Sequence, residues 1–407
     1  MSERIVRSEP RAAAVPLLDR IAVASLDRAL RHLEGGTLVV ELPDGTTRRY
    51  GSGPAVSMSI HDNGIFRRIA TRAKLGLGES YTANEWDTDD LVGLFELLLR
   101  NAEAAAQRHT TLRRILEARP RPNRRNGFLA ARRNIAYHYD LGNDLFELML
   151  DETMTYSCGI FESADDSLAD AQRRKYRRIC ETLQLGPDDR VLEIGCGWGG
   201  FARFASTEYG AHVTGLTISH AQATFARERN TAAGLDGRIA ILEEDYRRHD
   251  GSYTKVASIE MLEAIGEREF PTYFAAIDRF LEPAGRACVQ TILVPDERWN
   301  RYRKTPDWIE RYIFPGCLIP SLGALTAASG AASRLQITEA AEIGSNYAET
   351  LRRWRTNFHD RIEEVRALGY DARFERTWDF YLAFCEAAFR TRALRDVQLT
   401  LCRASDT

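Results

Sequence analysis

A glycine-rich run at residues 193–199, EIGCGWG, is the part of the sequence with the clearest chemical meaning. It follows the apolar pair Val191-Leu192, so it predicts a strand that ends in a tight turn before a helix. Gly195 and Gly197 carry no side chain, and the backbone of such a turn can approach a ligand closely. On this feature alone, the turn suits either a nicotinamide dinucleotide or S-adenosylmethionine.

Three details favour S-adenosylmethionine as the ligand of this turn. The acidic Glu193 precedes the first glycine, where it can face the cationic methionine end of the cofactor. The glycine spacing is ExGxGxG rather than the GxGxxG of dinucleotide sites. The next strand ends in Leu216-Thr217-Ile218-Ser219, followed by Gln222, and it lacks the acidic residue with which a dehydrogenase binds ribose.

Residues 185–295 alternate apolar strand patterns with amphipathic helix patterns around this turn. We expect strands beginning near residues 190, 212, 238, 255 and 286, and helices at 201–210, 220–234 and 270–285. This order predicts an α/β fold with a doubly wound parallel sheet, the Rossmann-like architecture of class I S-adenosylmethionine methyltransferases. Residues 296–407 are rich in aromatic side chains, and we expect a mostly helical cap over the carboxyl edge of the sheet.

Residues 1–106 predict a separate small α+β domain. Residues 37–50 are typical of two strands around a turn at 43–45. Apolar residues at helical spacing predict helices at 65–76 and 89–105. Between them, the glycine-rich stretch 76–86 is expected to be a connection.

Residues 107–133 contain nine Arg and one acidic residue, Glu117, and Pro120 and Pro122 should interrupt any helix. This Arg-rich segment is either an interdomain linker or a basic contact for anionic lipid headgroups.

The bulk composition excludes several classes of protein. The formal net charge of −3 argues against binding to nucleic acid. No apolar run approaches the ~20 residues that span a bilayer, and the first residues do not resemble a signal peptide, so we expect a cytoplasmic protein. The seven Cys are scattered without a CxxC pair, and no His pair has metal-ligand spacing. We therefore predict no metal site.

Several separated motifs resemble the cyclopropane fatty acid synthase family, which includes mycolic acid cyclopropane synthases and related lipid C-methyltransferases. The resemblance covers roughly residues 134–400, and 76–86 resembles the small N-terminal domain of the phospholipid-acting members. The motifs are NIAYHYDLGNDLFELMLDETMTYSCGIF, VLEIGCGWGGFA, GLTISHAQ, SIEMLEAIGEREFPTYF, WIERYIFPGCLIPS and YLAFCEAAFR.

The resemblance implies a set of contacts with S-adenosylmethionine. Tyr156 and Ser157 would close over the methionine end, with Gly195 and Gly197 beneath it. Leu216, Thr217 and Gln222 would reach the ribose, and Tyr246 and Arg247 would flank the adenine.

The resemblance also implies alkylation of the cis double bond of a lipid acyl chain, here an unsaturated phospholipid. An alkene is a poor nucleophile, so the site must orient it and exclude water. Aromatic faces can stabilise the resulting carbocation, and the candidates are Tyr137, Tyr139, Phe161, Tyr273 and Tyr312. A bound bicarbonate ion would then remove a proton, held by Cys158, Glu263, the backbone of Ile292, and Tyr312. Glu260 is expected to belong to the preceding strand.

Two positions depart from the family pattern: Gln290 stands where many members have His, and residues 263–266 read EAIG instead of EHVG. Gln290 can hydrogen-bond a bicarbonate ion or water but cannot titrate. We expect a cyclopropane ring as the product. The alternative is a methylene branch, which a partner reductase would convert to a methyl branch. With Gln at this position, the sequence resembles a subgroup of the family that includes enzymes of mid-chain methyl-branched fatty acid synthesis, of the tuberculostearic type.

Two other functions remain in competition: methylation of a soluble small molecule, and lipid binding without catalysis. For a lipid-alkylating enzyme we expect transient contact with the inner membrane surface, and a homodimer is compatible with the sequence.

Overall fold

A computed structural model describes residues 30–72, 74–108, 142–305 and 307–404, together with 23, 24, 27 and 28; side chains at 103–108 are excluded. The chain divides into two compact units, Met1–Leu116 and Glu117–Thr407. The division falls inside the Arg-rich segment 107–133, which lies almost entirely outside the described residues, as do Tyr137 and Tyr139.

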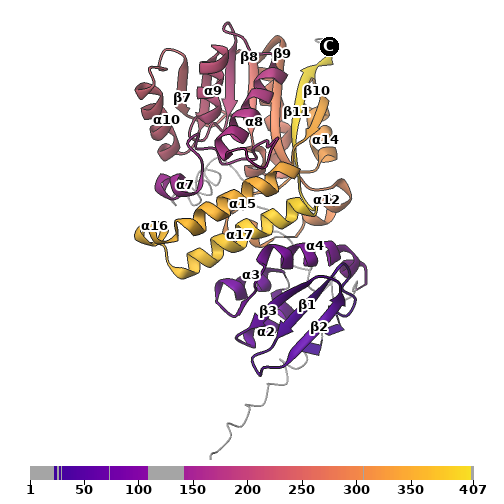
Figure 1. Ribbon diagram of the computed structural model, residues 1–407. Helices are drawn as coiled ribbons and strands as arrows, with labels where there is room; N and C mark the ends of the chain where they lie inside the picture. The colour runs from indigo at the N-terminus through magenta and orange to yellow at the C-terminus, as the bar shows by residue number, and fades with distance from the viewer. Residues whose placement is uncertain are drawn as a thin grey trace, which may run out of the picture. The chain divides into compact units, whose positions relative to one another are not determined.

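The first unit contains a four-stranded sheet in the order β2-β1-β3-β4 (Figure 1). The expected hairpin is confirmed, because β1 and β2 pair antiparallel around a turn in which Thr46 N donates to Asp44 Oδ1 at 2.9 Å. The elements are β1 (Gly36–Glu41), β2 (Thr47–Ser52), β3 (Ala55–Ile60), α2 (Gly64–Arg72), α3 (Lys74–Thr82), β4 (Trp86–Asp87) and α4 (Leu91–Arg108).

The prediction of a connection at 76–86 is wrong, because α3 and β4 occupy most of that stretch. Glycine disfavours a helix in isolation, but here it permits close packing. A Cβ at Gly76 would lie 2.2 Å from the carbonyl oxygen of Arg68 in α2, so only glycine lets α3 approach α2 this closely. Tertiary packing therefore overrides the local preference.

The second unit contains a seven-stranded sheet in the order β10-β11-β9-β8-β5-β6-β7. The strands β5 to β9 are parallel to their neighbours within that set, which confirms the doubly wound α/β fold. The strands are β5 (Arg190–Ile194), β6 (His212–Thr217), β7 (Ile239–Glu243), β8 (Tyr253–Ile259), β9 (Leu281–Leu293), β10 (Leu335–Glu342) and β11 (Arg395–Arg403).

Residues 296–407 do more than form a helical cap. They also supply β10 and β11, and β11 inserts antiparallel between β9 and β10. The helices of the second unit are α7 (Asn143–Met149), α8 (Leu168–Leu183), α9 (Gly200–Tyr209), α10 (His220–Ala232), α11 (Phe270–Phe280), α12 (Asp296–Tyr302), α13 (Trp308–Tyr312), α14 (Leu322–Ala332), α15 (Ser345–Asp360), α16 (Ile362–Ala367) and α17 (Ala372–Arg390), with 3₁₀ turns at Leu262–Ala264 and Glu267–Glu269.

Helices cover both faces of this sheet and also its carboxyl edge. Buried side chains of α8, α9 and α10 form one core, and those of α11 and α14 form the other. Figure 1 shows α15 and α17 side by side across the end of the sheet at which the parallel strands finish. Within the described residues, no helix is long and apolar enough to cross a membrane.

Candidate active site

A cavity lies at the carboxyl edge of the sheet, between the strand ends and the cap helices α15 and α17. Most of the predicted site residues line it, although they come from widely separated segments. The lining includes Tyr156, Ser157, Glu193, Gly195, Gly197, Leu216, Thr217, Gln222, Tyr246, Arg247, Glu263 and Ile292.

The glycine turn at the end of β5 is shaped for close contact. Gly195 has a φ of 81°, and a Cβ there would lie 2.5 Å from Cγ of Met261. In β5, Glu193 is buried, its Oε2 receives no hydrogen bond from the described residues, and burial raises its pKa to about 8. A cationic ligand group beside this oxygen would favour the charged carboxylate. The turn therefore fits the methionine end of S-adenosylmethionine.

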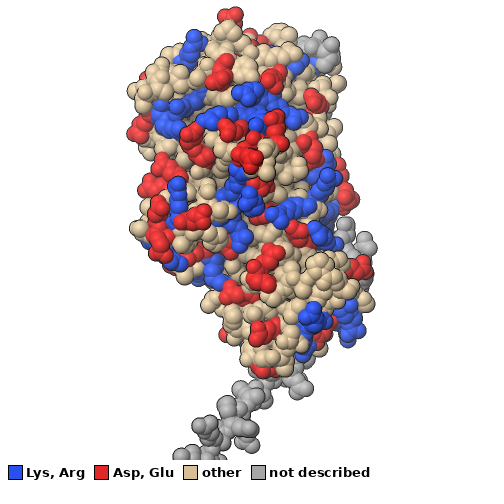
Figure 2. Space-filling view, in the orientation of Figure 1, with Lys and Arg blue, Asp and Glu red and all other residues tan. Residues whose placement is uncertain are grey.

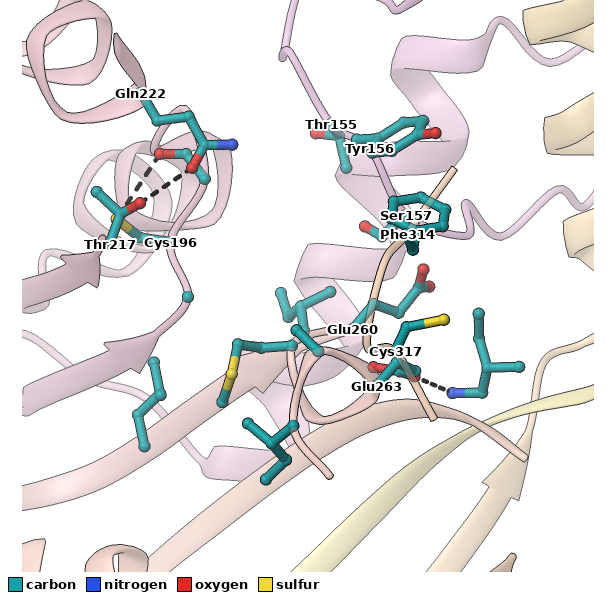
Figure 3. Close-up of a pocket in the computed structure, with 18 of the residues that line it drawn as sticks. Thr155, Tyr156, Ser157, Cys196, Thr217, Gln222, Glu260, Glu263, Phe314 and Cys317 are labelled. Atoms are coloured by element: carbon teal, nitrogen blue, oxygen red, sulfur yellow. Dashed lines mark hydrogen bonds between the residues drawn. The ribbon is translucent and has the colours of Figure 1, made fainter. Parts of the chain in front are cut away.

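Polar groups on β6 and α10 form a second part of the lining. The Thr217 hydroxyl donates to Gln222 Oε1 at 2.9 Å, and Ser219 caps α10. Figure 3 shows Thr217 and Gln222 together, apart from Glu260 and Glu263. This pair leaves the Gln222 amide group available to a ribose hydroxyl.

Tyr246 and Arg247 follow β7 and line the same cavity. The Tyr246 ring is buried and packs edge-on against Tyr273, with centroids 5.7 Å apart. Arg247 pairs with Asp245 through Nε at 2.9 Å. These contacts hold a flat ring and a planar guanidinium at the cavity wall, an arrangement that suits an adenine.

Tyr156 and Ser157 lie in the segment between α7 and α8. The Tyr156 hydroxyl is 2.7 Å from that of Tyr381 in α17, which links this segment to the cap. Ser157 Oγ accepts a hydrogen bond from the buried Lys175 Nζ at 2.7 Å. Burial lowers the pKa of Lys175 to about 8, while the nearby Glu260 acts in the opposite direction.

Glu260 is the main residue of the cavity lining that the sequence did not place in the site. The strand β8 ends at Ile259, and Glu260 follows with a φ of 48°, a left-handed conformation that is uncommon outside glycine. Its Oε1 accepts hydrogen bonds from Cys158 N and Gln290 Nε2, both at 2.8 Å, and Oε2 accepts one from the Tyr347 hydroxyl. The signal in the sequence was a charged residue directly after an apolar strand.

Glu263 lies in the 3₁₀ turn after β8, at the carboxyl edge as expected. Its Oε1 accepts hydrogen bonds from the Thr291 hydroxyl at 2.9 Å and from Ile292 N. Burial, with a smaller contribution from the negative Glu260, raises the pKa of Glu263 to about 8. At neutral pH this group therefore holds a proton, and its buried Oε2 lacks a partner among the described residues.

Three predicted site residues do not line the cavity. Cys158 is fully buried and contributes its backbone N–H to Glu260, while its thiol faces carbonyl oxygens. Gln290 is fully buried behind Glu260. Tyr312 ends α13 and packs on Trp308, and it does not line the cavity in which an ion would be held. The tyrosine that lines the cavity beside Glu260 is Tyr347 of α15.

The aromatic lining also differs from expectation. Phe161 and Tyr273 do not line the cavity, and Tyr273 is fully buried in the core of the sheet. The rings that do line it near Glu260 belong to Phe314, Tyr347, Tyr381 and Phe389. Figure 3 shows Phe314 and Cys317 on the same side of the cavity as Glu260 and Glu263, away from Thr217 and Gln222. Within the described part of the chain, no group of three or more His, Cys, Asp or Glu could hold a metal ion.

Comparison with known proteins identifies the family of the chain. Residues 129–399 match the family model described as mycolic acid cyclopropane synthetase. The chain is 40% identical to the tuberculostearic acid methyltransferase UfaA1 of Mycobacterium tuberculosis, over 98% of this chain and 94% of the relative. It is 37% identical to a cyclopropane-fatty-acyl-phospholipid synthase of Escherichia coli, over 86% of this chain and 87% of the relative.

Solved structures extend the similarity to the fold. The cyclopropane synthase MmaA2 from Mycobacterium tuberculosis aligns with a TM-score of 0.62 at 28% identity, covering 66% of this chain and 97% of that one. The mycolic acid cyclopropane synthase CmaA1, solved with S-adenosylhomocysteine and CTAB, aligns with a TM-score of 0.62 at 29% identity, again over 66% and 97%. The chain therefore belongs to the mycolic acid cyclopropane synthetase family and is an S-adenosylmethionine-dependent methyltransferase.

Proposed function

We propose that this enzyme methylates the cis double bond of an unsaturated acyl chain in a phospholipid, and that Glu260 accepts the proton that the substrate then loses. The observation that carries the proposal is the Glu260 carboxylate, held by three hydrogen bonds at an otherwise largely apolar part of the cavity. The printed names of the relatives, one acting on a fatty-acyl phospholipid, support the substrate class.

The cavity wall suits a hydrocarbon chain. S-adenosylmethionine, when bound, supplies an electrophilic methyl group. The residues of this chain then have to orient the alkene and exclude water, because water is the better nucleophile. The apolar lining on the side of α13, α15 and α17 provides such a surface through Ile309, Phe314, Ile319, Leu351, Phe389 and Leu394.

Methyl transfer leaves a positive charge on the neighbouring carbon of the acyl chain. The Tyr347 and Phe389 rings stack with centroids 4.4 Å apart, and both line the cavity together with Phe314 and Tyr381. An aromatic face stabilises a nearby cation by ~0.5–2 kcal/mol. The negative Glu260 adds a stronger, more local attraction and can also accept the proton.

The groups expected to hold bicarbonate are already in use. Cys158 N–H and the Gln290 amide donate to Glu260, Ile292 N–H donates to Glu263, and Tyr312 does not line the cavity. We therefore propose a carboxylate of the chain as the base in place of a bicarbonate ion.

For the product, we propose a methylene-branched acyl chain, the precursor of a methyl branch once a partner reductase acts. A hydride shifts from the methylated carbon to the neighbouring cationic carbon, so the charge moves to the branch point, and Glu260 then accepts a proton from the new methyl group. Support comes from the match to a tuberculostearic acid methyltransferase over 98% of this chain, and from Gln290 in place of a titratable group. The second candidate is a cyclopropane ring, favoured by the similarity to the E. coli enzyme.

Incubation with an oleoyl phospholipid and S-adenosylmethionine tests the function. We expect a lipid heavier by one methylene unit, with exomethylene signals in the proton NMR spectrum. Cyclopropyl signals would instead establish the second candidate. Absence of any modified lipid, with S-adenosylmethionine binding intact, would refute alkylation of this lipid class.

The base is tested with Glu260→Gln. We expect turnover to fall by about 10²–10⁴-fold, the usual contribution of a general base, with binding of S-adenosylhomocysteine retained. The matched control is Glu386→Gln, a buried glutamate of α17 that does not line the cavity, which should keep turnover within about threefold. If the Glu260→Gln variant keeps its turnover and this turnover depends on added bicarbonate, the bicarbonate ion and not Glu260 is the base.

A further inference from the structure

A second carboxyl group, Asp396, is fully buried beside Glu260. It lies in β11, paired in register with Ile292 of β9. The Gln290 amide bridges the two acids, with Nε2 at 2.8 Å from Glu260 Oε1 and 3.1 Å from Asp396 Oδ2. The two carboxyls thus share one amide donor, and each acts electrostatically on the other. Two buried carboxyls that share one amide group cannot both be charged without a large cost, so one of them holds a proton.

Counting donors shows which acid carries the proton. Glu260 accepts from Cys158 N, Gln290 Nε2 and the Tyr347 hydroxyl. Asp396 accepts from Gln290, and its Oδ1 receives no hydrogen bond from a described N–H or O–H group. Burial raises the pKa of Glu260 as well, but its three donors and the nearby Lys175 act in the opposite direction, because they stabilise the charged form of the carboxyl. The charge therefore belongs on Glu260 and the proton on Asp396. Burial, reinforced by the negative Glu260, raises the pKa of Asp396 well above its ordinary value.

The surrounding charges agree with this assignment. The titratable groups that act on Asp396 or lie against it are Lys175, Cys158, Glu260, Glu263 and Tyr347. Lys175 is a buried cation of this cluster, and among the neighbouring acids Glu260 has the largest effect on its pKa. A second ionised carboxyl would leave an uncompensated negative charge away from water, which is costly.

We propose that Asp396 is a positioning residue that stays protonated and donates a hydrogen bond to Glu260, so that Glu260 remains the single charged carboxylate facing the substrate. The inference rests on the proposed role of Glu260 as the base. Glu260 gains one proton from the substrate cation and, because it lines the cavity, releases that proton to water after the product has left. Asp396 does not line the cavity and keeps its own proton throughout.

Asp396→Asn reproduces the protonated state, because the amide group can donate to Glu260 while its carbonyl accepts from Gln290. We expect the acid limb in the pH profile of kcat to lie at the same pH as in the wild type. Asp396→Ala removes the donor to Glu260, so its acid limb should move to higher pH. An acid limb that moves to lower pH in Asp396→Asn would show that a negative charge has been removed, and would overturn the proposal. An Asp396→Asn chain that does not fold would also contradict it.

Infrared spectra of the resting enzyme separate this inference from the proposed function. At neutral pH, the spectrum of the wild type minus the spectrum of Asp396→Asn should contain the carbonyl stretch of a protonated carboxyl. This band should shift when the protein is deuterated. Glu263→Gln should remove a different band. Absence of the Asp396 band would refute its protonation even if Glu260→Gln abolishes turnover. Full turnover by Glu260→Gln would refute the base while leaving the Asp396 band in place.

Discussion

Glu193 and Glu263 both line the cavity, and burial raises the pKa of each to about 8. Both groups are therefore protonated at neutral pH in the absence of a ligand. Their responses to ligand and to pH should differ, because Glu193 faces the proposed cationic end of the cofactor while Glu263 is tied to Thr291 and Ile292.

Binding of S-adenosylmethionine should release a proton from Glu193. The cationic ligand favours the charged carboxylate, so near pH 7 we expect release to approach one proton per ligand and affinity to weaken as the pH falls. Calorimetry in buffers of different ionisation enthalpy measures this release. Glu193→Gln should bind more weakly and release no proton; equal release by this variant would assign the proton to another group.

Glu263 should make the stability of the fold depend on pH. Its ordinary pKa is 4.5 and its folded pKa is about 8, so its favourable contribution is complete below pH 4.5 and is lost as the pH rises toward 8. The slope is at most about 1.4 kcal/mol per pH unit for one proton. Urea unfolding between pH 4.5 and pH 8 gives the free energy of unfolding at each pH. This free energy should fall less steeply with pH for Glu263→Gln than for the wild type.

The control for that experiment is Glu349→Gln. Arg352 and Arg353 lower the pKa of Glu349 to about 2. The contribution of Glu349 to the free energy of unfolding therefore changes with pH only below pH 4.5. Its slope should match the wild type. Identical slopes for Glu263→Gln and the wild type would place the Glu263 proton elsewhere.

The cavity lining around the glycine turn was predictable because it is local: a strand, two glycines and an acid lie within a few positions of each other. The carboxylate site was not, because its members meet only through the fold. Tyr347 is 87 positions from Glu260, and Asp396 is 106 positions from Gln290. Tyr312 was chosen for its place in a motif, whereas the cavity wall is formed by α15.

At the level of elements, the parallel strands of the second unit were predictable from their apolar runs. The helix α3 and the strands β10 and β11 were not. In β10 the sequence LQITEAAE is mostly exposed and has weak strand preference, so pairing with β11 determines its conformation.

Gly76→Ala should loosen the packing of α3 on α2. The added Cβ would lie 2.2 Å from Arg68 O, and relief of such a clash costs about 1–3 kcal/mol. Amide hydrogen exchange in α2 and α3 of the full chain should therefore accelerate. Gly330→Ala in α14 is the control, because a Cβ there meets open space. Unchanged exchange in Gly76→Ala would show that the two helices separate without cost.

For the whole molecule, the face shown in Figure 2 mixes Lys and Arg with Asp and Glu, in keeping with the formal net charge of −3. The strongest departure from this balance in the sequence is the Arg-rich segment 107–133, which lies almost entirely outside the described residues. Its role at a lipid surface therefore remains a prediction from the sequence.

Replacement of Arg113, Arg114, Arg124 and Arg125 by Gln should weaken binding to anionic vesicles. Clustered basic residues contribute about 1 kcal/mol each near such a surface, and salt screens the attraction. Co-sedimentation at two salt concentrations measures the effect. Neutral phosphatidylcholine vesicles are the control, and equal binding of variant and wild type to anionic vesicles would assign the segment to a linker.

The insertion of β11 between β9 and β10 has a consequence for synthesis on the ribosome. A nascent chain that has reached α17 possesses the glycine turn and Glu260 but lacks the strand that carries Asp396 and joins β10 to the sheet. Until residues 395–403 emerge, β10 has no neighbour and the acid beside Glu260 is absent. Translation therefore delivers the glycine turn and Glu260 before the strand that completes the sheet and sets Asp396 beside Glu260.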